Sequence, residues 1–166
     1  MSVFYMIRGL PGSGKSTFAK KLAGDQYGKV THYETDQYFV DPVTNEYKFE
    51  ANRIRAAHEW CFGKFSDHIR GQMGNVVVSN TFTEFWEMES YFAEAMFHEW
   101  TVIVITMLDD FGNVHNVPQA TLDKMRNRFL DSKRIRVLAD AAFNYEDLLF
   151  FDLSLKSDHP MFTTLL

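Results

Sequence analysis

The stretch Gly9-Leu-Pro-Gly-Ser-Gly14-Lys15-Ser16 decides the fold of this chain. It matches the pattern G-x-x-x-x-G-K-[ST] at every fixed position. Residues 3–8 (VFYMIR) before it form a short apolar run that is typical of a buried strand, and residues 15–22 after it suit a helix. Strand, glycine loop and helix thus follow one another in the order that a phosphate-binding loop requires.

The residue types in this loop predict a site for a nucleoside triphosphate with magnesium. Glycines let consecutive backbone N–H groups converge on phosphate oxygens, and the start of the following helix adds positive potential. Lys15 can reach the β- and γ-phosphates, and Ser16 can bind Mg²⁺. We therefore expect ATP or GTP to be held by six consecutive residues, Gly12, Ser13, Gly14, Lys15, Ser16 and Thr17.

Apolar runs alternate with segments of helical periodicity along the rest of the chain. Further strands are expected at residues 30–34 (VTHYE), 75–79 (NVVVS), 100–107 (WTVIVITM) and 148–153 (LLFFDL). Helices are expected over 49–69, over a segment that carries Phe85, Met88, Phe92 and Met96 on one face, and from Pro118 with Leu122, Met125 and Phe129 inward. This alternation predicts an α/β fold: a three-layer α/β/α sandwich of the P-loop NTPase type, with a mostly parallel sheet of about five strands.

Length and composition favour one compact domain that spans residues 1–166. The net charge of −5 argues against a surface that coats itself with nucleic acid, because such binding depends on many phosphate contacts. A glycine and a proline interrupt the first apolar run, which is therefore neither a signal peptide nor a membrane span. We expect a cytoplasmic protein without a membrane partner, in which the single cysteine, Cys61, belongs to the core.

Beyond the loop, the sequence resembles the kinase halves of phage and animal polynucleotide 5′-kinases and related kinase-like domains of eukaryotic ubiquitin-ligase-binding proteins. The similarity covers most of residues 1–130. It rests on RGLPGSGKST at 8–17, TDQYF at 35–39, AAHEW at 56–60, SNTFTEFWEMESYF at 79–92 and HNVP at 115–118. The resemblance implies an ATP- and magnesium-dependent kinase that transfers the γ-phosphate to a hydroxyl, with the 5′-hydroxyl of DNA or RNA as the leading acceptor.

The resemblance also implies roles for two polar residues that follow predicted strands. Asp36 matches the aspartate that deprotonates the attacking hydroxyl, although it could instead cap a turn or helix before Tyr38. Asp41 is a second, weaker candidate for the base. Asn80 matches a position that reaches magnesium or the acceptor, although Asn80 and Thr81 could equally cap the helix that begins near Glu84.

Several other residues of the matching motifs are expected to be structural. His58 and Trp60 match an Ala-His-x-Trp pattern, and we expect them and Trp86 to serve packing rather than catalysis. His115, which stands shortly before Pro118, is expected to belong to a structural turn.

The sequence departs from its relatives in two places. Phe39 stands where polynucleotide kinases carry an arginine that grips the acceptor phosphate. Gly112-Asn113 stands where relatives carry an Arg-Asn pair on a longer lid, so the lid is short and its arginine is missing. The catalytic set that we predict is therefore Lys15 and Asp36 with Arg126 or Arg128 in place of the lid arginine.

Arg126 and Arg128 belong to a basic cluster that we expect in one helical segment. Its members are Lys124, Arg126, Arg128, Lys133, Arg134 and Arg136. Alternatively, this cluster is a solvated helix face that pairs with Asp123 and Asp131.

Three functions remain open at this point. The first is a kinase that acts on a 5′-hydroxyl polynucleotide end. The second is a kinase for a small hydroxyl acceptor (a nucleoside, nucleotide or sugar), which would suit the acidic net charge and the ring of Phe39, since an aromatic ring can stack on a free base. The third is an ATP-binding module with weak catalysis that acts through a partner. The sequence leaves the acceptor, the preference for ATP over GTP and the oligomeric state undetermined.

Overall fold

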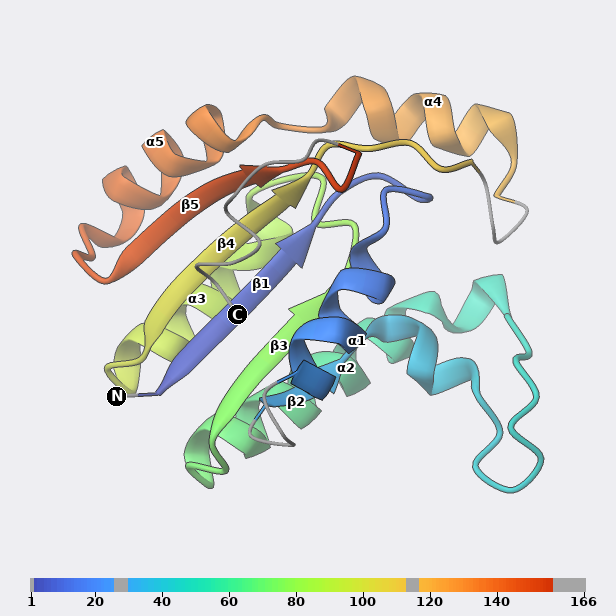
Figure 1. Cartoon of the computed structure of the whole chain (residues 1–166), viewed down its shortest axis with the longest axis horizontal. Coiled ribbons are helices and arrows are strands. Elements are labelled where there is room, and N and C mark those ends of the chain that lie inside the picture. The colour runs from blue at the N-terminus through green and yellow to red at the C-terminus, as the bar shows by residue number, and fades with distance from the viewer. Residues whose placement is uncertain (1, 26–29, 113–116, 157–166) are drawn as a thin grey trace.

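Five parallel strands form one sheet in the computed structural model, which describes residues 2–25, 30–112 and 117–156 (Figure 1). The strand order across the sheet is β2-β3-β1-β4-β5. The strands are β1 (Val3–Arg8), β2 (Val30–Tyr33), β3 (Asn75–Ser79), β4 (Thr101–Met107) and β5 (Leu148–Leu153). The sequence prediction of a parallel five-stranded sheet is therefore confirmed.

Strand β1 lies at the centre of the sheet and carries the phosphate loop at its end. Phe4 pairs with Val76 of β3 on one side and with Val102 of β4 on the other. The central strands are almost continuous apolar runs, as expected where helices cover both faces of a parallel sheet.

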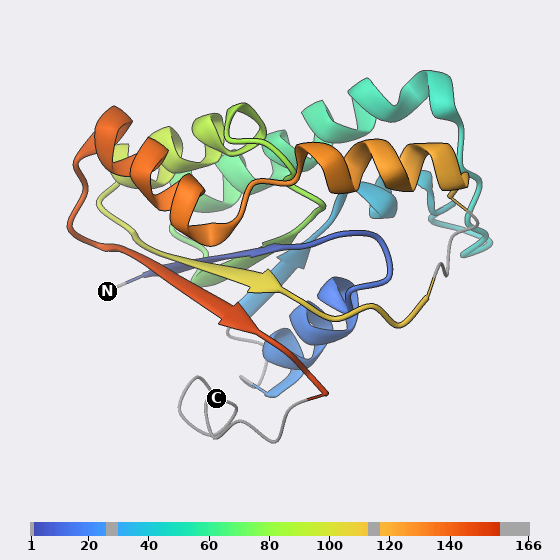
Figure 2. The ribbon, with the colours of Figure 1, turned by 90° about the horizontal axis from the view of Figure 1, so that it is seen from above.

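In the part of the chain that the structure describes, five α-helices and two 3₁₀ turns accompany the strands. The helices are α1 (Lys15–Asp25), α2 (Ile54–Arg70), α3 (Trp86–Phe97), α4 (Gln119–Arg128) and α5 (Ser132–Phe143), and the 3₁₀ turns are η1 (Thr35–Phe39) and η2 (Ala51–Arg53). Helix α2 begins five residues later than predicted, because η2 precedes it. The three layers agree with the prediction: α1 covers one face of the sheet, and α2, α3 and α5 cover the other (Figure 2).

The expectation of one basic helical segment after Pro118 is wrong, because the segment divides into α4 and α5. Helix α4 ends at Arg128, and Phe129 has an extended backbone. The carboxylate of Asp131 then accepts a hydrogen bond from the Arg134 amide and so caps the start of α5. The six cations are consequently shared between two helices with different neighbours.

Two apolar cores hold the layers together. Phe18, Ala19 and Leu22 of α1 pack on one face of the sheet. Phe65 of α2 and Phe92 of α3 belong to the larger core on the other face, which also contains Cys61, as the sequence predicts. In the described ranges, no helix has the length and apolar character needed to cross a bilayer.

The carboxyl ends of the strands gather the segments that the sequence singles out. The phosphate loop follows β1, η1 follows β2, residues 80–85 follow β3, and residues 108–112 follow β4. Helix α4 and residues 40–50 both extend beyond this edge (Figure 1 and Figure 2). Because ligands of such sheets bind at this edge, these segments form the candidate site.

Candidate nucleotide and phosphotransfer site

The phosphate loop has a backbone conformation that its glycines make possible. Gly12 and Gly14 have φ angles of 80° and 88°, in the left-handed region that side chains disfavour. A Cβ atom on Gly12 would lie 2.1 Å from the carbonyl oxygen of Gly112, so the residues after β4 pack directly on the loop. The Phe111 amide also donates a hydrogen bond to the Gly12 carbonyl at 2.9 Å.

The side chain of Lys15 folds back over the loop. Its Nζ donates a hydrogen bond to the Leu10 carbonyl at 2.8 Å. Burial lowers the pKa of Lys15 to about 8, and the negative charges of Asp36 and Glu34 oppose this shift. Lys15 therefore lies within electrostatic reach of two carboxylates that come from the end of β2.

The backbone and side-chain atoms of the loop fit a bound phosphate chain. Within the described residues, the buried hydroxyl of Ser13 has no hydrogen-bond partner. Ser16 is half-buried and Thr17 is exposed in the first turn of α1, which begins with a hydrogen bond from the Phe18 amide to the Gly14 carbonyl. A single serine oxygen is a sufficient protein ligand for Mg²⁺, which keeps waters and takes phosphate oxygens. The role of Gly12 to Thr17 as phosphate ligands stays a prediction that this geometry allows.

Asp36 lies in the 3₁₀ turn η1, directly after β2. The Tyr47 hydroxyl donates a hydrogen bond to Asp36 Oδ1 at 3.4 Å. Burial, and then the charge of Asp36, raises the pKa of Tyr47 to about 12, so this hydroxyl stays protonated and keeps donating. The turn is capped by Glu34 and not by Asp36, because Glu34 forms a capping box with Gln37. The alternative that Asp36 caps this turn is therefore wrong. Its role as the base stays a prediction.

Glu34 is a candidate that the sequence reading missed. Its carboxylate is buried, accepts a hydrogen bond from the Ser79 hydroxyl at 3.2 Å and lies 3.8 Å from Lys20 Nζ. His32 Nε2 lies 2.7 Å from the same hydroxyl. The spacing Glu34-x-Asp36 at the end of a strand was the signal that could have revealed this second carboxylate beside the loop.

Asn80 connects the end of β3 to the turn that carries Asp36. Its Oδ1 accepts a hydrogen bond from the Thr35 amide at 2.9 Å, and its side chain is buried. The alternative that Asn80 caps helix α3 is wrong, because Glu87 accepts the hydrogen bond from the Glu84 amide at the start of that helix. The role of Asn80 at magnesium stays a prediction, while its observed contact fixes η1.

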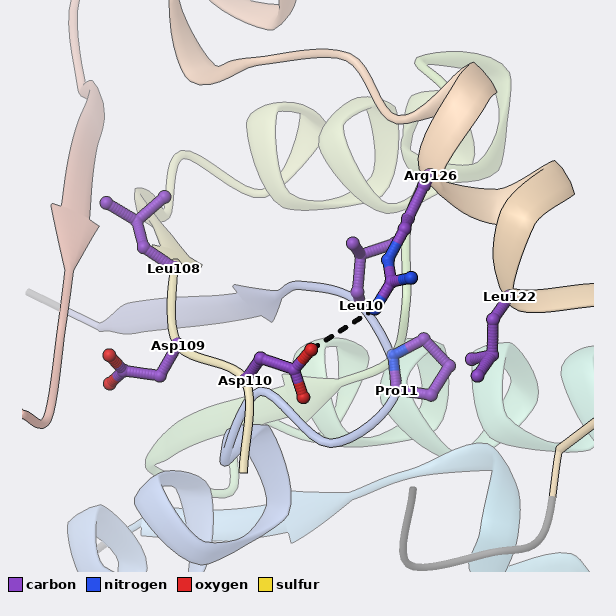
Figure 3. Close-up of a pocket in the computed structure, with 7 residues that line it drawn as sticks. All are labelled: Leu10, Pro11, Leu108, Asp109, Asp110, Leu122 and Arg126. Atoms are coloured by element: carbon purple, nitrogen blue, oxygen red, sulfur yellow. Dashed lines mark hydrogen bonds and ion pairs between the residues drawn. The ribbon is translucent and has the colours of Figure 1, made fainter. Parts of the chain in front are cut away.

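The two arginines of α4 have different surroundings. Arg126 Nη2 lies 3.1 Å from Asp110 Oδ2, and its side chain reaches from α4 towards the phosphate loop (Figure 3). Arg128 Nη1 lies 3.8 Å from Glu84 Oε2, on the side of the segment after β3. Arg126 belongs to the wall of a pocket of about 80 Å³ that is lined by Leu10, Pro11, Leu108, Asp109, Asp110, Leu122 and Arg126. The structure thus brings Arg126 to the loop, and it directs Arg128 elsewhere.

Arg8 is a second residue that the sequence reading did not identify. It immediately precedes Gly9 and is fully buried, where it donates hydrogen bonds to the carbonyls of Phe82 (3.0 Å) and Leu130 (2.6 Å). Its guanidinium also lies 4.2 Å from the ring centroid of Phe129, between α4 and α5. Burial lowers the pKa of Arg8 to about 10, so it stays charged at neutral pH. Arg8 therefore ties the start of the phosphate loop to the end of α4.

The structure bears on several smaller predictions and contradicts those for Phe39 and Trp86. Phe39 is only 5% exposed, so its ring is not free to stack on a base. Trp86 is 64% exposed and does not serve core packing. Asp41 holds its own turn through hydrogen bonds from the amides of Val43 and Thr44, and these lower its pKa. His58 Nδ1 lies 3.4 Å from the Thr35 hydroxyl, next to the site, and His115 lies outside the described residues.

Comparisons with known proteins agree with this geometry at the level of fold. No family model matches the chain. Human NEDD4-binding protein 2 is 33% identical over 101 residues, which is 61% of this chain but only 6% of the length of that curated relative.

Three solved structures give the fold. A putative kinase from Chloroflexus aurantiacus has a TM-score of 0.63 and 13% identity, with 99% of this chain and 95% of that chain covered. Chaetomium thermophilum Kti12 in complex with ADP-AlF3 has a TM-score of 0.60 and 11% identity, with 98% and 94% covered. Shikimate kinase from Aquifex aeolicus has a TM-score of 0.51 and 16% identity, with 95% and 88% covered. The chain has the fold of P-loop kinases.

Proposed function

We propose that this protein is a magnesium-dependent kinase that transfers the γ-phosphate of ATP to a hydroxyl group. The observation that carries the proposal is the position of Lys15, which is buried at the phosphate loop and near enough to Asp36, in the turn after β2, for the charge of that carboxylate to act on its pKa. Phosphoryl transfer needs a grip on the phosphates, charge neutralisation and one group that orients the attacking hydroxyl. The fold is also that of Kti12, whose structure is a complex with ADP-AlF3.

Each residue has a defined part in the proposed reaction. The amides of Gly12 to Thr17 bind the β- and γ-phosphates, and Lys15 donates to their oxygens. Ser16, supported by Asn80, would hold magnesium, which would supply positive charge beside the phosphates. Asp36 accepts the proton of the acceptor hydroxyl as its oxygen bonds to the γ-phosphorus, and ADP leaves. Arg126 pairs with Asp110, two residues before Gly112, and supplies a cation near the place where the lid arginine is missing.

The 5′-hydroxyl of DNA or RNA is the acceptor that the sequence resemblance favours. A small hydroxyl acceptor is a second candidate, and it is favoured by the acidic character of the segments around Asp36. Residues 34–60 contain six carboxylates and three cations. A module that binds ATP and acts through a partner is the third candidate, because Gly112 supplies no side chain to the transferred phosphate.

The test is transfer of label from γ-labelled ATP to a panel of 5′-hydroxyl oligonucleotides, nucleosides, nucleotides and sugars. We expect one acceptor class to be labelled, and we expect excess chelator to stop the transfer. Lys15→Ala should abolish both transfer and triphosphate binding, because no other side chain of the loop carries a positive charge. Lys64→Ala, at an exposed position of α2, is the matched control and should change neither.

Two results would contradict the proposal in different ways. Unchanged ATP binding by Lys15→Ala in calorimetry would remove the assignment of the phosphate loop. Tight ATP binding by the parent protein without transfer to any acceptor would instead favour the binding module.

A further inference from the structure

The segment between β2 and α2 folds back on itself beside Asp36. It leaves β2 through η1, turns at Asp41 and returns through an antiparallel bridge between Val40 and Tyr47. Hydrogen bonds from the Asp41 amide to the Glu46 carbonyl (2.9 Å) and from the Lys48 amide to the Phe39 carbonyl (2.8 Å) hold this return. The turn thereby brings Tyr47 back to the carboxylate of Asp36, eleven residues earlier in the chain.

Aromatic side chains make this segment a surface on which a ring can lie. The buried ring of Phe39 is surrounded by Tyr38, Tyr47 and Phe49, with centroids 5.3, 6.3 and 5.1 Å away. Tyr47 and Phe49 cover it from outside and are themselves 43% and 54% exposed. We call Tyr47 and Phe49, with the partly exposed Val40 that pairs with Tyr47, the acceptor face. It is an exposed apolar surface that directly adjoins the candidate base.

The cations around the acceptor face are already paired. Lys48 Nζ lies 2.7 Å from Glu46 Oε2, and Arg55 Nε lies 2.9 Å from Glu59 Oε1. Arg53 lies 3.3 Å from Glu50 Oε1 and also donates a hydrogen bond to the Tyr38 hydroxyl. A phosphate that binds this segment must therefore compete with a carboxylate for each cation.

Charge is distributed unequally over the two sides of the site. Residues 34–60 carry twice as many carboxylates as cations, and residues 79–90, after β3, carry three glutamates and no cation. Residues 117–136, which include α4, carry six cations and two carboxylates. A triphosphate is therefore attracted from the side of α4, whereas a phosphate that approaches over the acceptor face meets a negative potential.

On the basis of the proposed kinase activity, we propose that the acceptor face binds an uncharged hydroxyl compound with a flat ring, such as a nucleoside. The same face rejects acceptors that carry a phosphate beside the reacting nucleoside. The ring stacks on Phe49 and Tyr47, and the hydroxyl then points at Asp36. A polynucleotide end presents the same hydroxyl, but its first internucleotide phosphate enters the acidic surroundings. The absence of an arginine at position 39 agrees with this choice.

Three acceptors with the same 5′-hydroxyl test the proposal: adenosine, adenosine 3′-monophosphate and a 5′-hydroxyl oligonucleotide that begins with adenosine. We expect kcat/KM for adenosine to exceed that for the 3′-monophosphate at least tenfold. The kcat/KM for the oligonucleotide should not exceed that for the 3′-monophosphate. Added salt should reduce the difference in kcat/KM between adenosine and the two phosphate-bearing acceptors, because salt screens exposed charges. Calorimetry on protein loaded with a non-hydrolysable ATP analogue should give a lower Kd for adenosine than for the 3′-monophosphate and the oligonucleotide.

Variants separate the ring contact from the charge effect. Phe49→Ala should raise KM for adenosine about tenfold with little change in kcat, and Phe49→Tyr should restore it. Phe97→Ala, at an exposed position near the end of α3, is the matched control. The double variant Glu46→Gln/Glu50→Gln should raise kcat/KM for the 3′-monophosphate more than for adenosine, because it releases Lys48 and Arg53 from their partners.

The outcomes distinguish this inference from the proposed function. Equal or better use of the 3′-monophosphate or oligonucleotide would overturn the inference and leave the kinase proposal standing. An absence of transfer to every acceptor would contradict the kinase proposal, and the Kd order on the analogue-loaded protein would still decide whether the acceptor face prefers an uncharged ring.

Discussion

Asp36 and Lys15 follow different strands of the sheet, and their surroundings differ. Lys15 loses solvent by lying over the loop, and the neighbouring carboxylates keep part of its charge stabilised. Asp36 receives a hydrogen bond from a tyrosine that stays protonated. A carboxylate held in this way can point at an incoming hydroxyl without being neutralised by a direct lysine contact.

We predict that Asp36→Asn keeps ATP affinity while it lowers turnover by roughly a hundredfold or more, which is the usual loss for a positioned base. The substitution preserves shape and removes basicity. Steady-state kinetics at saturating acceptor, with calorimetry for ATP, measure both quantities. A fall of less than about threefold would mean that another group orients the hydroxyl.

The lowered pKa of Lys15 predicts proton uptake when ATP binds. Above about pH 8 most of the free protein has a neutral Lys15, and the bound phosphates favour the charged form. Calorimetry at about pH 8.5, in buffers with different ionisation enthalpies, should show uptake of about 0.7 proton per ATP. At about pH 7 the uptake should nearly vanish, because Lys15 is then already charged. Equal uptake at both pH values would contradict the shifted pKa.

The lowered pKa of Lys15 also affects the stability of the free protein. Its effect on stability with rising pH is opposite in sign to its effect on ATP affinity. Between about pH 8 and the ordinary lysine value of 10.5, the folded state binds fewer protons than the unfolded state. Lys15 therefore makes the free energy of unfolding rise with pH between these two values. Below about pH 8, the full cost of burying the charged Lys15 is present.

At the scale of elements, the division of the basic segment into α4 and α5 changes what the arginines can do. Helix α4 directs Arg126 to the phosphate loop (Figure 3). It directs Arg128 to Glu84. In the structure Arg126 pairs with Asp110, which belongs to the residues after β4 that lie beside the loop. An arginine in this position has a carboxylate partner that a γ-phosphate can replace.

We predict that Arg126→Ala impairs phosphate transfer by at least tenfold and that Arg128→Ala changes it less than threefold. The physical reason is that transfer spreads negative charge over equatorial oxygens, and a nearby cation stabilises this charge. Single-turnover rates with saturating ATP measure the effect. Arg136→Ala on α5 provides a control on an element that does not reach the loop. Parental rates in both α4 variants would mean that the cluster is an ordinary solvated face.

Sequence patterns predicted the elements well where local periodicity decides them. Residues 75–79 and 148–153 are strands with the predicted bounds. The first is a buried inner strand, as its apolar run predicts, and the second lies at the edge of the sheet and is partly exposed. The break after Arg128 was missed, since Asp131 caps α5 through a local contact that competes with continued helical periodicity. The sequence could not reveal that Phe39 is covered by Tyr47 and Phe49, because the return of residues 41–49 is a tertiary arrangement.

At the scale of the whole molecule, Arg8 joins regions that are far apart in the sequence. It stands at the end of the central strand and bonds to the segment after β3, to β4 through Thr106 and to the junction of α4 and α5. The sequence places an arginine at the end of an apolar strand, where solvent exposure is the ordinary expectation. Full burial follows from the partners that the fold assembles around it.

We predict that Arg8→Met lowers the free energy of unfolding by about 3 kcal/mol, because it leaves buried carbonyl oxygens of Phe82 and Leu130 without a donor. Urea denaturation followed by circular dichroism measures the loss. Arg55→Met, at a largely exposed position of α2, is the control and should cost less than about 1 kcal/mol. Because Arg8 also holds the end of α4, the folded Arg8→Met variant should lose part of the rate that depends on Arg126. A variant as stable as the parent would show that water or a rearranged junction satisfies these carbonyls, and the link between the phosphate loop and α4 would then not depend on Arg8.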